Sequence, residues 1–428
     1  MDPGANPLLQ RAASGDSAAQ YQLGMLHASQ AQYAQSREWL ARASAQGHAD
    51  AAAWLGLHAL YGYGATPDFP AALRELEAAE AHGSAEAAYR LALLGWGDRL
   101  VARDPQRMAQ RLVAAARGDH AAALRGLALV HARSGRADPE RARAGESCLR
   151  RAAALGDAAA LHLLAARFAR HRDPRRRAEA PGLYAAAANR GLARAATRIA
   201  PGTRELPFRA PPPVEWPPPL FDAGPPAQAA QRHCERPLIE TVDGFFGDEE
   251  CEYLVALAEP FQQRSVTVSE EGRLQPHPNR SSSDAPLFGP REDFGARWLQ
   301  ARMLDWLHAP LAQGEHLVVL RYRPGEEYRP HVDWLPPGAR GNVADASQPG
   351  QRVHTVFAYL DEVGAGGETD FPRVRVRVSP RRGRIVHFTN LLADGTPDED
   401  TLHAGLPVRA GEKWLATIWT RQRPYREY

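Results

Sequence analysis

The first two hundred residues contain a glycine that recurs at intervals of 32, 36, 35, 38 and 35 residues. Each of these glycines lies between two alanine-rich segments with helical periodicity. Small residues at helical spacing let two helices pack closely, and glycine supplies the turn between them. The six glycines are Gly15, Gly47, Gly83, Gly118, Gly156 and Gly191. This period predicts an α-solenoid of helical hairpins, in which each hairpin buries its apolar face only against its neighbours.

Two segments carry a more specific pattern within these repeats. Residues 19–24 read Ala-Gln-Tyr-Gln-Leu-Gly, and residues 43–47 read Ala-Ser-Ala-Gln-Gly. This pattern resembles Sel-one-like repeats, which are relatives of the tetratricopeptide repeat. The resemblance implies a scaffold that binds a protein partner across residues 1–200. A stabilising or oligomerising appendage without a ligand stays open as an alternative, because a solenoid fold does not specify a partner.

A proline-rich break follows at residues 201–235. Its segment 211–219 reads Pro-Pro-Pro-Val-Glu-Trp-Pro-Pro-Pro, which cannot continue a helix and favours extended polyproline II. We expect a semi-rigid linker between two domains. A ligand for a proline-binding module, or a tethered mimic of a substrate, is the functional alternative.

The remaining residues, 236–428, have the texture of a β-rich domain. Short runs rich in β-branched and aromatic residues are separated by glycine and proline, and such closely spaced strands favour a sandwich or jelly roll. We predict one helix that is capped by Asp248 and runs through residues 251–257, and a second over 294–307. The predicted strands are 239–242, 316–322, 353–360, 373–378, 384–388 and 414–420.

Composition and local segments bear on the cellular location of the protein. The formal net charge is +2 and 44% of residues are hydrophobic, as in ordinary globular proteins. We find no secretory signal at the N-terminus and no apolar run of about 18 residues that could form a membrane helix. The three cysteines, Cys148, Cys234 and Cys251, are odd in number and far apart, which argues against a disulfide framework. These features predict a cytoplasmic protein.

Two features of the C-terminal region indicate metal chemistry. His331 and Asp333 are two residues apart, so on a strand both side chains point to the same side. With a distant histidine they provide three ligands on one face of an octahedron, the arrangement of ferrous oxygenases, whose open positions accept a chelating 2-oxo acid and dioxygen. Zinc is the main competitor for this ligand set, but a closed structural zinc site needs a fourth protein ligand. Lys413 is the only lysine among fifty-two basic residues, and it follows His403 by ten residues.

The surrounding motif is more specific than the ligands alone. Residues 322–333 read Tyr-Arg-Pro-Gly-Glu-Glu-Tyr-Arg-Pro-His-Val-Asp. This segment resembles the signature of prolyl 4-hydroxylases, and residues 366–369 and 403–421 match the same family in the same order. The resemblance implies a double-stranded β-helix that uses Fe(II), dioxygen and 2-oxoglutarate, with ascorbate as a candidate reductant. It also implies decarboxylation of 2-oxoglutarate to succinate, coupled to hydroxylation.

The resemblance also implies roles for individual residues. Iron is expected at His331, Asp333 and His403. The distal carboxylate of 2-oxoglutarate is expected at Lys413, with help from Tyr322 and Thr369. A desolvated carboxylate needs a charged partner and further hydrogen bonds, which agrees with this assignment.

Three further residues match positions on the peptide-substrate side of the family. They are Tyr328, Arg352 and Trp419. The alternative for each is structural, because strand aromatics mostly pack in cores and arginines mostly lie in solvent.

Four other features carry weaker expectations. Residues 334–351 form a long loop that we expect to act as a mobile lid. The arginines between 373 and 384 could form a basic surface for an acidic ligand or nucleic acid, but a charged edge strand is the plainer interpretation. The acidic segment 392–400 could select a basic target. His354 and His387 are expected to be packed or surface residues.

The sequence therefore predicts an Fe(II)- and 2-oxoglutarate-dependent dioxygenase fused to helical repeats. Its expected substrate is a prolyl residue in a protein or peptide, recruited by the repeats, without a membrane partner. The same chemistry on a free amino acid or natural product remains an alternative. So does a non-catalytic scaffold, and a nucleic-acid demethylase is a third possibility.

Overall fold

The computed structural model describes residues 7–134, 138–206, 216–221, 229–268, 274–276, 279–336 and 349–428. Internal contacts divide the chain into two units, and the division falls within one helix, between Leu127 and Ala128. Residues 216–219 and Tyr428 belong with the first unit, and the remainder up to Glu427 forms the second unit. We describe each unit by itself.

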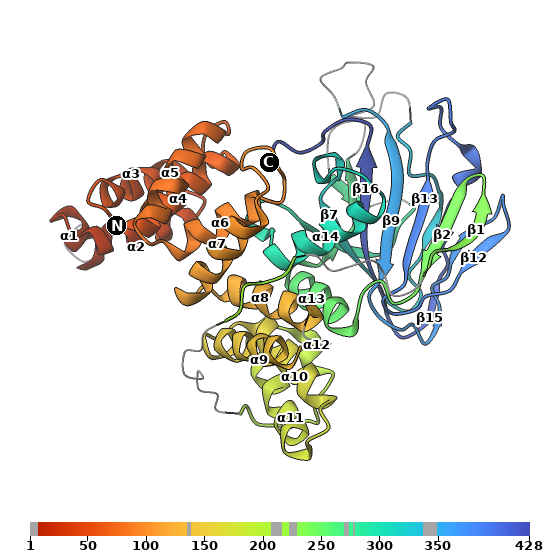
Figure 1. Ribbon diagram of the computed structural model, residues 1–428, viewed down its shortest axis with the longest axis horizontal. Coiled ribbons are helices and arrows are strands. Elements are labelled where there is room, and N and C mark those ends of the chain that lie inside the picture. The colour runs from red at the N-terminus through yellow and green to blue at the C-terminus, as the bar shows by residue number, and fades with distance from the viewer. Residues whose placement is uncertain are drawn as a thin grey trace. The chain divides into compact units, whose positions relative to one another are not determined.

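The first unit is built from antiparallel helical hairpins (Figure 1). Helix α2 packs against α3, α4 against α5 and α6 against α7. Helix α3 also packs against α4 of the next pair, and α5 packs against α6. The N-caps Asp16, Asp68, Ser84 and Asp104 accept hydrogen bonds from the first turns of their helices. The helices are α1 Pro7–Ala13, α2 Ser17–Ser29, α3 Tyr33–Ser44, α4 Ala49–Tyr61, α5 Phe69–Ala81, α6 Ala85–Leu94, α7 Pro105–Arg117 and α8 Ala121–Ser134. The predicted α-solenoid is confirmed.

Five of the six repeating glycines adopt the backbone conformation for which glycine is suited. Their φ angles lie between 81° and 100°, in the left-handed region that a Cβ atom disfavours. Gly118 is the exception, because the residue after it, Asp119, takes the positive φ of 61° instead. Aspartate tolerates this region better than most residues, so the turn survives a shift by one position.

The second unit begins with the last hairpins of the repeat array. Helix α10 packs against α9 and α11, and it also contacts α13. His162 on α10 and Glu252 on α13 are both buried and are joined by a 3.0 Å contact between Nε2 and Oε2. The helices are α9 Pro139–Ala154, α10 Ala158–Ala169, α11 Pro174–Asn189, α12 Ala193–Ala196, α13 Asp248–Ala258 and α14 Phe294–Trp306. The last repeats and the β-rich region therefore share one buried polar network.

Two antiparallel sheets form the core of this unit. The larger has the strand order β1-β2-β13-β9-β16-β7-β6-β3, and the smaller has the order β12-β11-β14-β8. The strands of the larger sheet are β1 Gln231–Glu235, β2 Leu238–Val242, β3 Gln263–Arg264, β6 Ser283–Leu287, β7 Leu317–Tyr322, β9 Arg352–Tyr359, β13 Ile385–Thr389 and β16 Lys413–Arg421. Those of the smaller are β8 Tyr328–His331, β11 Thr369–Phe371, β12 Val376–Val378 and β14 His403–Gly405. Two-stranded ladders pair β4 Val266–Val268 with β5 Leu274–Pro276, and β10 Ala365–Gly366 with β15 Val408–Ala410.

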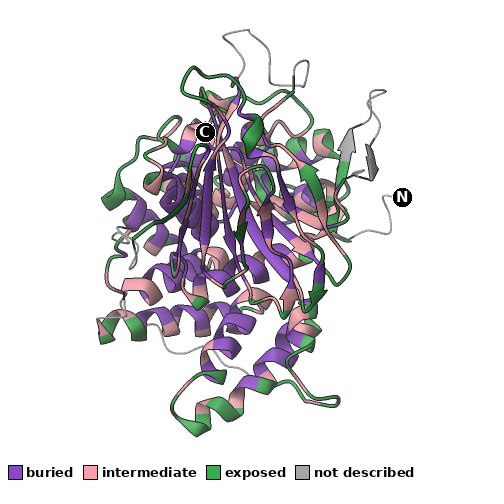
Figure 2. Cartoon of the chain, turned by 90° about the vertical axis from the view of Figure 1, so that its right-hand side faces the viewer, coloured by how far each residue is buried: buried purple, intermediate pink, exposed green. Residues whose placement is uncertain are grey.

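The hydrophobic core draws on both sheets. Phe357 and Leu415 of the larger sheet and Phe371 and Val378 of the smaller belong to one buried cluster. In Figure 2, buried residues are concentrated along the long central strands. Burial of one face of each sheet against the other is the physical basis of a jelly roll, and the predicted fold class is confirmed.

Most predicted elements of this region are present, with two local corrections. The predicted strand 373–378 begins only at Val376, because Arg375 has a φ of 56° and ends a turn. Asp248 is the first residue of α13 rather than its N-cap. The N-cap is Gly247, whose backbone N–H donates to the Glu250 carboxylate over 2.7 Å.

Several predictions concern residues outside those that the structure describes. These are residues 207–215 and 222–228 of the proline-rich segment and residues 337–348 of the expected lid. Domain boundaries at residues 200 and 236 stay a prediction.

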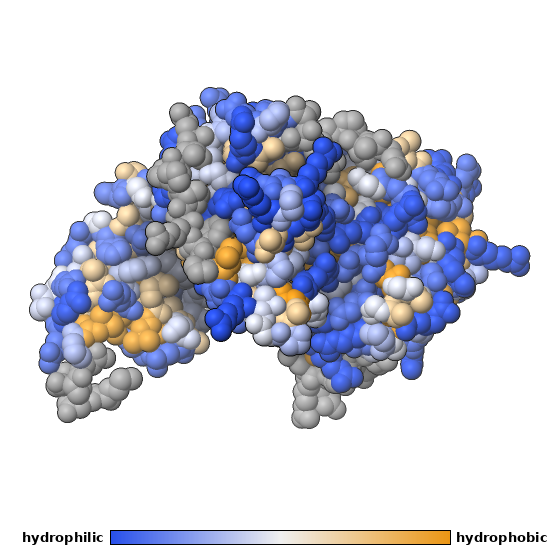
Figure 3. Space-filling view, turned by 90° about the horizontal axis from the view of Figure 1, so that it is seen from below, coloured by the Kyte–Doolittle hydropathy of each residue, from blue (hydrophilic) through white to orange (hydrophobic). Residues whose placement is uncertain are grey.

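The three cysteines are free, and Cys148 and Cys251 are buried. None of the helices in the described ranges combines the length and apolar character that a membrane crossing requires. Hydrophilic residues cover most of the face shown in Figure 3, where hydrophobic residues appear as separate patches.

Candidate metal and cosubstrate site

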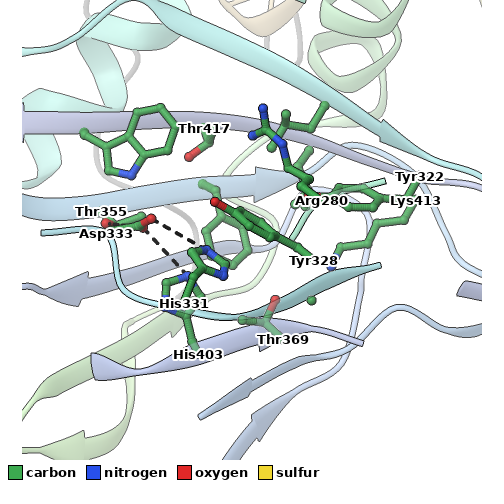
Figure 4. A pocket seen from close by; sticks show the side chains of 15 residues that line it. Arg280, Tyr322, Tyr328, His331, Asp333, Thr355, Thr369, His403, Lys413 and Thr417 are labelled. Atoms are coloured by element: carbon green, nitrogen blue, oxygen red, sulfur yellow. Dashed lines mark hydrogen bonds and ion pairs between the residues drawn. The ribbon is translucent and has the colours of Figure 1, made fainter. Parts of the chain in front are cut away.

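Strand pairing brings His331 and His403 together. His331 is the last residue of β8, His403 is the first of β14, and the two are directly opposite each other in the antiparallel ladder. Asp333 lies two residues past the end of β8, so it reaches the site from a bend rather than from the strand itself. Figure 4 shows the three side chains converging on one point. Asp333 Oδ1 is 3.7 Å from His331 Nε2, and Asp333 Oδ2 is 3.8 Å from His403 Nε2.

Backbone carbonyls determine which imidazole nitrogens face the site. His331 Nδ1 lies 2.8 Å from Arg329 O, and His403 Nδ1 lies 2.9 Å from Thr401 O. A carbonyl oxygen can only accept, so each Nδ1 carries a proton and each Nε2 keeps its lone pair. Both lone pairs therefore point toward Asp333, which is the arrangement that metal-ligating histidines adopt.

The charge states of the cluster also favour metal binding. Burial, together with the nearby His403, lowers the pKa of His331 to about 3, so its imidazole is neutral. Burial alone raises the pKa of Asp333, but His403, His331 and Arg352 outweigh it and lower the pKa to about 2. The site thus offers a neutral imidazole at His331 and a carboxylate at Asp333.

The donor set fits Fe(II). One ligand atom from each of the three side chains lies within 4.8 Å of the others, and the described ranges contain no second cluster of this kind. Two imidazoles and a carboxylate on one side of a metal leave adjacent positions open for other ligands. A closed zinc site would need a fourth protein ligand.

Lys413 occupies another part of the same pocket. Its side chain is 2% exposed, and among the residues that the structure describes no carboxylate lies within ion-pair distance of Nζ. Burial is the main reason that the pKa of Lys413 falls to about 7, although Glu368 acts in the opposite direction. A buried ammonium without a charged partner is costly, so the pocket is suited to an anionic ligand.

Two tyrosine rings and a threonine lie in the same part of the structure as this ammonium. Tyr322 and Thr369 both border the pocket, and the Tyr359 hydroxyl lies 2.8 Å from Thr369 Oγ1. Lys413 Nζ is 5.3 Å from the centroid of the Tyr322 ring and 5.6 Å from that of Tyr359. This part of the pocket can therefore supply a positive charge and hydrogen bonds to one carboxylate.

One pocket joins the two groups of residues, because the metal cluster and Lys413 both line it. Tyr328 and Trp419, two residues expected on the substrate side, border it, and the Tyr328 ring stacks on His331 with centroids 3.4 Å apart. Arg352 does not border the pocket. It lies behind Trp419, with its guanidinium carbon 4.1 Å from the centroid of the indole ring.

A buried carboxylate holds Arg352 in that place. Glu315 accepts from Arg352 Nε over 2.7 Å and from Nη2 over 2.8 Å. Glu315 also accepts from Arg421 Nη1 over 3.0 Å, and Arg352 Nη1 donates to Asp333 O over 3.3 Å. Arg352 is thus neither a solvated strand residue nor a pocket wall, but a paired cation beside the site.

Sequence reasoning missed several residues of the pocket. Arg280, Thr355 and Thr417 are among them. Arg280 Nη2 donates to Asp284 over 2.8 Å, and its guanidinium lies 5.4 Å from the centroid of the Tyr328 ring. No spacing rule links these residues to the His-x-Asp motif, because they arrive from other strands through register alone.

Most of the arginines between 373 and 384 are paired with acids. Arg377 pairs with Asp370, and both Arg381 and Arg384 pair with Asp243. Arg382 reaches Glu252 over 3.0 Å. The plainer interpretation of a charged strand edge fits these ion pairs.

Burial and pairing describe the two histidines and one acid of the segment 392–400. His354 Nδ1 and His387 Nε2 lie 3.1 Å apart, so these histidines bond to each other. In the acidic segment 392–400, Asp398 is buried and its side chain accepts from Asp400 N over 2.9 Å. Asp398 is therefore a structural cap and is not available to a basic target.

Comparison with known proteins agrees with this geometry. Residues 317–421 match the model of the 2OG-Fe(II) oxygenase superfamily. Prolyl 4-hydroxylase 1 of Arabidopsis thaliana is 33% identical over 202 residues, which cover 44% of this chain and 70% of that protein. The chain belongs to the prolyl 4-hydroxylase family of 2OG-Fe(II) oxygenases.

Two solved structures are also similar. The viral collagen prolyl hydroxylase of Paramecium Bursaria Chlorella virus-1, in complex with 2OG, is 31% identical and covers 43% of this chain and 95% of its own, with a TM-score of 0.33. A Sel1 repeat protein from Oxalobacter formigenes is 22% identical and covers 45% of this chain and 76% of its own, with a TM-score of 0.34. The assignment of this chain as a 2-oxoglutarate-dependent dioxygenase rests on the family match, and the family uses Fe(II), 2-oxoglutarate and dioxygen.

Proposed function

We propose that this dioxygenase hydroxylates a prolyl residue in a protein or peptide and couples this reaction to decarboxylation of 2-oxoglutarate to succinate. The observation that carries the proposal is one pocket that contains both the His331, Asp333 and His403 cluster and Lys413, which has no carboxylate partner within the described ranges. The relatives named as prolyl 4-hydroxylases support the prolyl substrate. Iron bound at the cluster would activate dioxygen for the oxidation.

In this proposal, His331, Asp333 and His403 hold the metal. The contacts of the histidine Nδ1 atoms already orient the two rings, and Thr355 Oγ1 donates to the Asp333 carboxylate. Little reorganisation is therefore needed when the metal binds, and adjacent positions stay open for the cosubstrate.

Lys413 pairs with the distal carboxylate of 2-oxoglutarate, and Tyr322 and Thr369 donate hydrogen bonds to it. The ammonium is buried without a carboxylate partner among the described residues, so the cosubstrate supplies the negative charge that pairs with it. The separation between Lys413 and the metal cluster then determines how 2-oxoglutarate is oriented in the pocket.

Tyr328 and Trp419 provide the wall for the substrate, and Arg352 holds Trp419 from behind. Aromatic faces suit a prolyl ring, which has no charge and no N–H donor within a peptide. We propose that the repeats recruit the target protein, since helical repeat arrays form extended binding surfaces.

The test is release of succinate by the full chain with Fe(II), 2-oxoglutarate and a panel of proline-containing peptides, with His331→Ala as control. We expect turnover stimulated by peptide, a gain of one oxygen atom on a proline, and loss of both in the control. Turnover that is indifferent to every peptide would refute the prolyl substrate while leaving the oxygenase assignment in place.

A further inference from the structure

A chain of hydrogen bonds leads from the interior of the fold to Asp333. Thr355 Oγ1 donates to Asp333 Oδ2 over 2.8 Å, and Asn390 Nδ2 donates to Thr355 Oγ1 over 3.0 Å. Asn390 is 0% exposed and Thr355 is 2% exposed. Because burial removes bulk water as a competing partner, the orientation of each group depends on its protein neighbours.

The chemistry of the three groups determines the direction of both bonds. An ionised carboxylate can only accept, so the single proton of Thr355 is used at Asp333. Thr355 Oγ1 can then only accept from Asn390, which requires that the NH₂ group of Asn390, and not its carbonyl oxygen, faces the threonine. Asn390 thereby prevents the threonine hydroxyl from turning away.

Asn390 uses only half of its side chain. Its Oδ1 is buried and has no hydrogen-bond partner in the described part of the chain. An unsatisfied buried acceptor is destabilising, so this half of the amide does not account for the presence of asparagine. The donor to Thr355 is therefore the informative half of this amide.

The backbone of Asn390 extends the connection to His403. Asn390 O accepts from Asp398 N over 3.0 Å, and Asp398 O accepts from Thr401 Oγ1 over 2.6 Å. Thr401 O in turn contacts His403 Nδ1 over 2.9 Å. One buried residue is thus connected to two of the three side chains at the metal cluster.

We propose that Asn390 and Thr355 are positioning residues for the metal centre. Asn390 holds Thr355 as a donor to Asp333 Oδ2, which fixes the carboxylate plane and leaves Oδ1 for the metal. This inference rests on the proposed function, because it assumes that His331, Asp333 and His403 bind a metal. Outer partners of metal ligands commonly contribute 10–100-fold to metal affinity.

The test is the affinity of the full chain for Mn(II), measured by equilibrium dialysis without 2-oxoglutarate. We expect Thr355→Val and Asn390→Asp to raise the Kd by about 10–100-fold, because the first removes the donor to Asp333 and the second replaces the donor to Thr355 with an acceptor. Thr355→Ser keeps the hydroxyl and should restore binding to near the original affinity. Thr389→Val is the matched control, since Thr389 is the last residue of β13 and directly precedes Asn390. This substitution should not change the Kd.

Three further results make the outcome decisive. If Asn390→Asp unfolds, the contrast between Thr355→Val and Thr355→Ser decides, with thermal melting of the metal-free chain as the check on folding. Mn(II) affinity within twofold of the original in both Thr355→Val and Asn390→Asp overturns the inference. If the original chain does not bind Mn(II), or if His331→Ala binds it equally well, the proposed function itself fails.

Discussion

Lys413 and Tyr322 are directly opposite each other in the neighbouring antiparallel strands β16 and β7, and Lys413 Nζ lies 5.3 Å from the centroid of the tyrosine ring. The only lysine of the chain is thus held by strand register against an aromatic wall rather than against an acid. Its burial without a carboxylate partner in the described residues explains why its pKa falls to about 7.

Binding of 2-oxoglutarate should depend on pH through Lys413. Because the free ammonium titrates near pH 7 and the bound anion stabilises the charged form, binding takes up a proton above this pH. We expect the Kd to rise about tenfold for each pH unit above pH 7 until the pKa of the complex is reached. Isothermal titration with Fe(II) under anaerobic conditions measures this dependence. In Lys413→Arg, whose guanidinium stays protonated, any residual binding should show no such slope, and a flat profile in the original chain contradicts the assignment.

Replacing Lys413 by methionine should stabilise the chain when neither metal nor cosubstrate is present. The pKa of Lys413 is lowered on folding from 10.5 to about 7, so the unfolded chain binds more protons between these values and stability rises with pH across that window. The penalty is therefore fully present below pH 7 and disappears above about pH 10. We expect Lys413→Met to gain roughly 2–5 kcal/mol in the free energy of unfolding at pH 6.5.

Urea denaturation at pH 6.5 and pH 10 measures the difference between the two proteins. The gain in the free energy of unfolding from Lys413→Met should be smaller at the higher pH. An equal gain at both pH values would mean that packing, and not the buried charge, is responsible.

Loss of the Glu252 carboxylate should destabilise the second unit. This side chain is 2% exposed, and His162, Arg194 and Arg382 surround it. Burial alone raises the pKa of Glu252, but these partners outweigh it and hold the pKa well below its usual range. Removal of one partner from a buried ionic network costs about 3–5 kcal/mol, so we expect Glu252→Ala to lower the free energy of unfolding by that amount at pH 7.

The same depressed pKa gives a sign for the pH dependence. The contribution of Glu252 is present above the unfolded pKa of about 4.5 and is lost as the pH falls below it. The difference in the free energy of unfolding between Glu252→Ala and the original chain should therefore become smaller as the pH falls below about 4.5. Glu235→Ala, an exposed acid on β1, is the control and should change stability by less than about 0.5 kcal/mol.

Glu315→Gln should affect the substrate and spare the cosubstrate. Glu315 holds Arg352 against Trp419, and neither Glu315 nor Arg352 borders the pocket near Lys413. We expect the KM for a peptide substrate to rise by about tenfold, a loss of roughly 1.4 kcal/mol, with the KM for 2-oxoglutarate unchanged within twofold. Steady-state kinetics with each substrate varied in turn measures both values, and an equal rise in both would show that Glu315 supports the whole site instead.

The sequence is sufficient to predict most elements of this fold because periodicity reports burial directly. The recurring glycines predict the hairpins, and alternating or continuous apolar runs predict β7, β9, β13 and β16 within one or two residues. The shift of the left-handed position from Gly118 to Asp119 could not be anticipated, since both residues suit a turn. The cytoplasmic location, ascorbate and the lid remain predictions.

The candidate metal ligands and Lys413 could be recognised because their spacing and the surrounding motif are visible in the sequence itself. Thr355, Asn390 and Glu315 could not, because their roles arise from register between distant strands and loops. The buried contact between His162 and Glu252 is similarly invisible in the sequence, as two residues ninety positions apart carry no shared pattern.

The most direct test of the account is a calorimetric titration of 2-oxoglutarate into the full chain with Fe(II) under anaerobic conditions, beside His403→Ala and Lys413→Ala. We predict one binding site in the original chain and loss of binding in His403→Ala, because the metal is no longer held. In Lys413→Ala, which keeps the metal ligands, we predict a Kd at least about 100-fold higher. Unchanged 2-oxoglutarate affinity in either variant would contradict the assignment of metal and cosubstrate to this pocket.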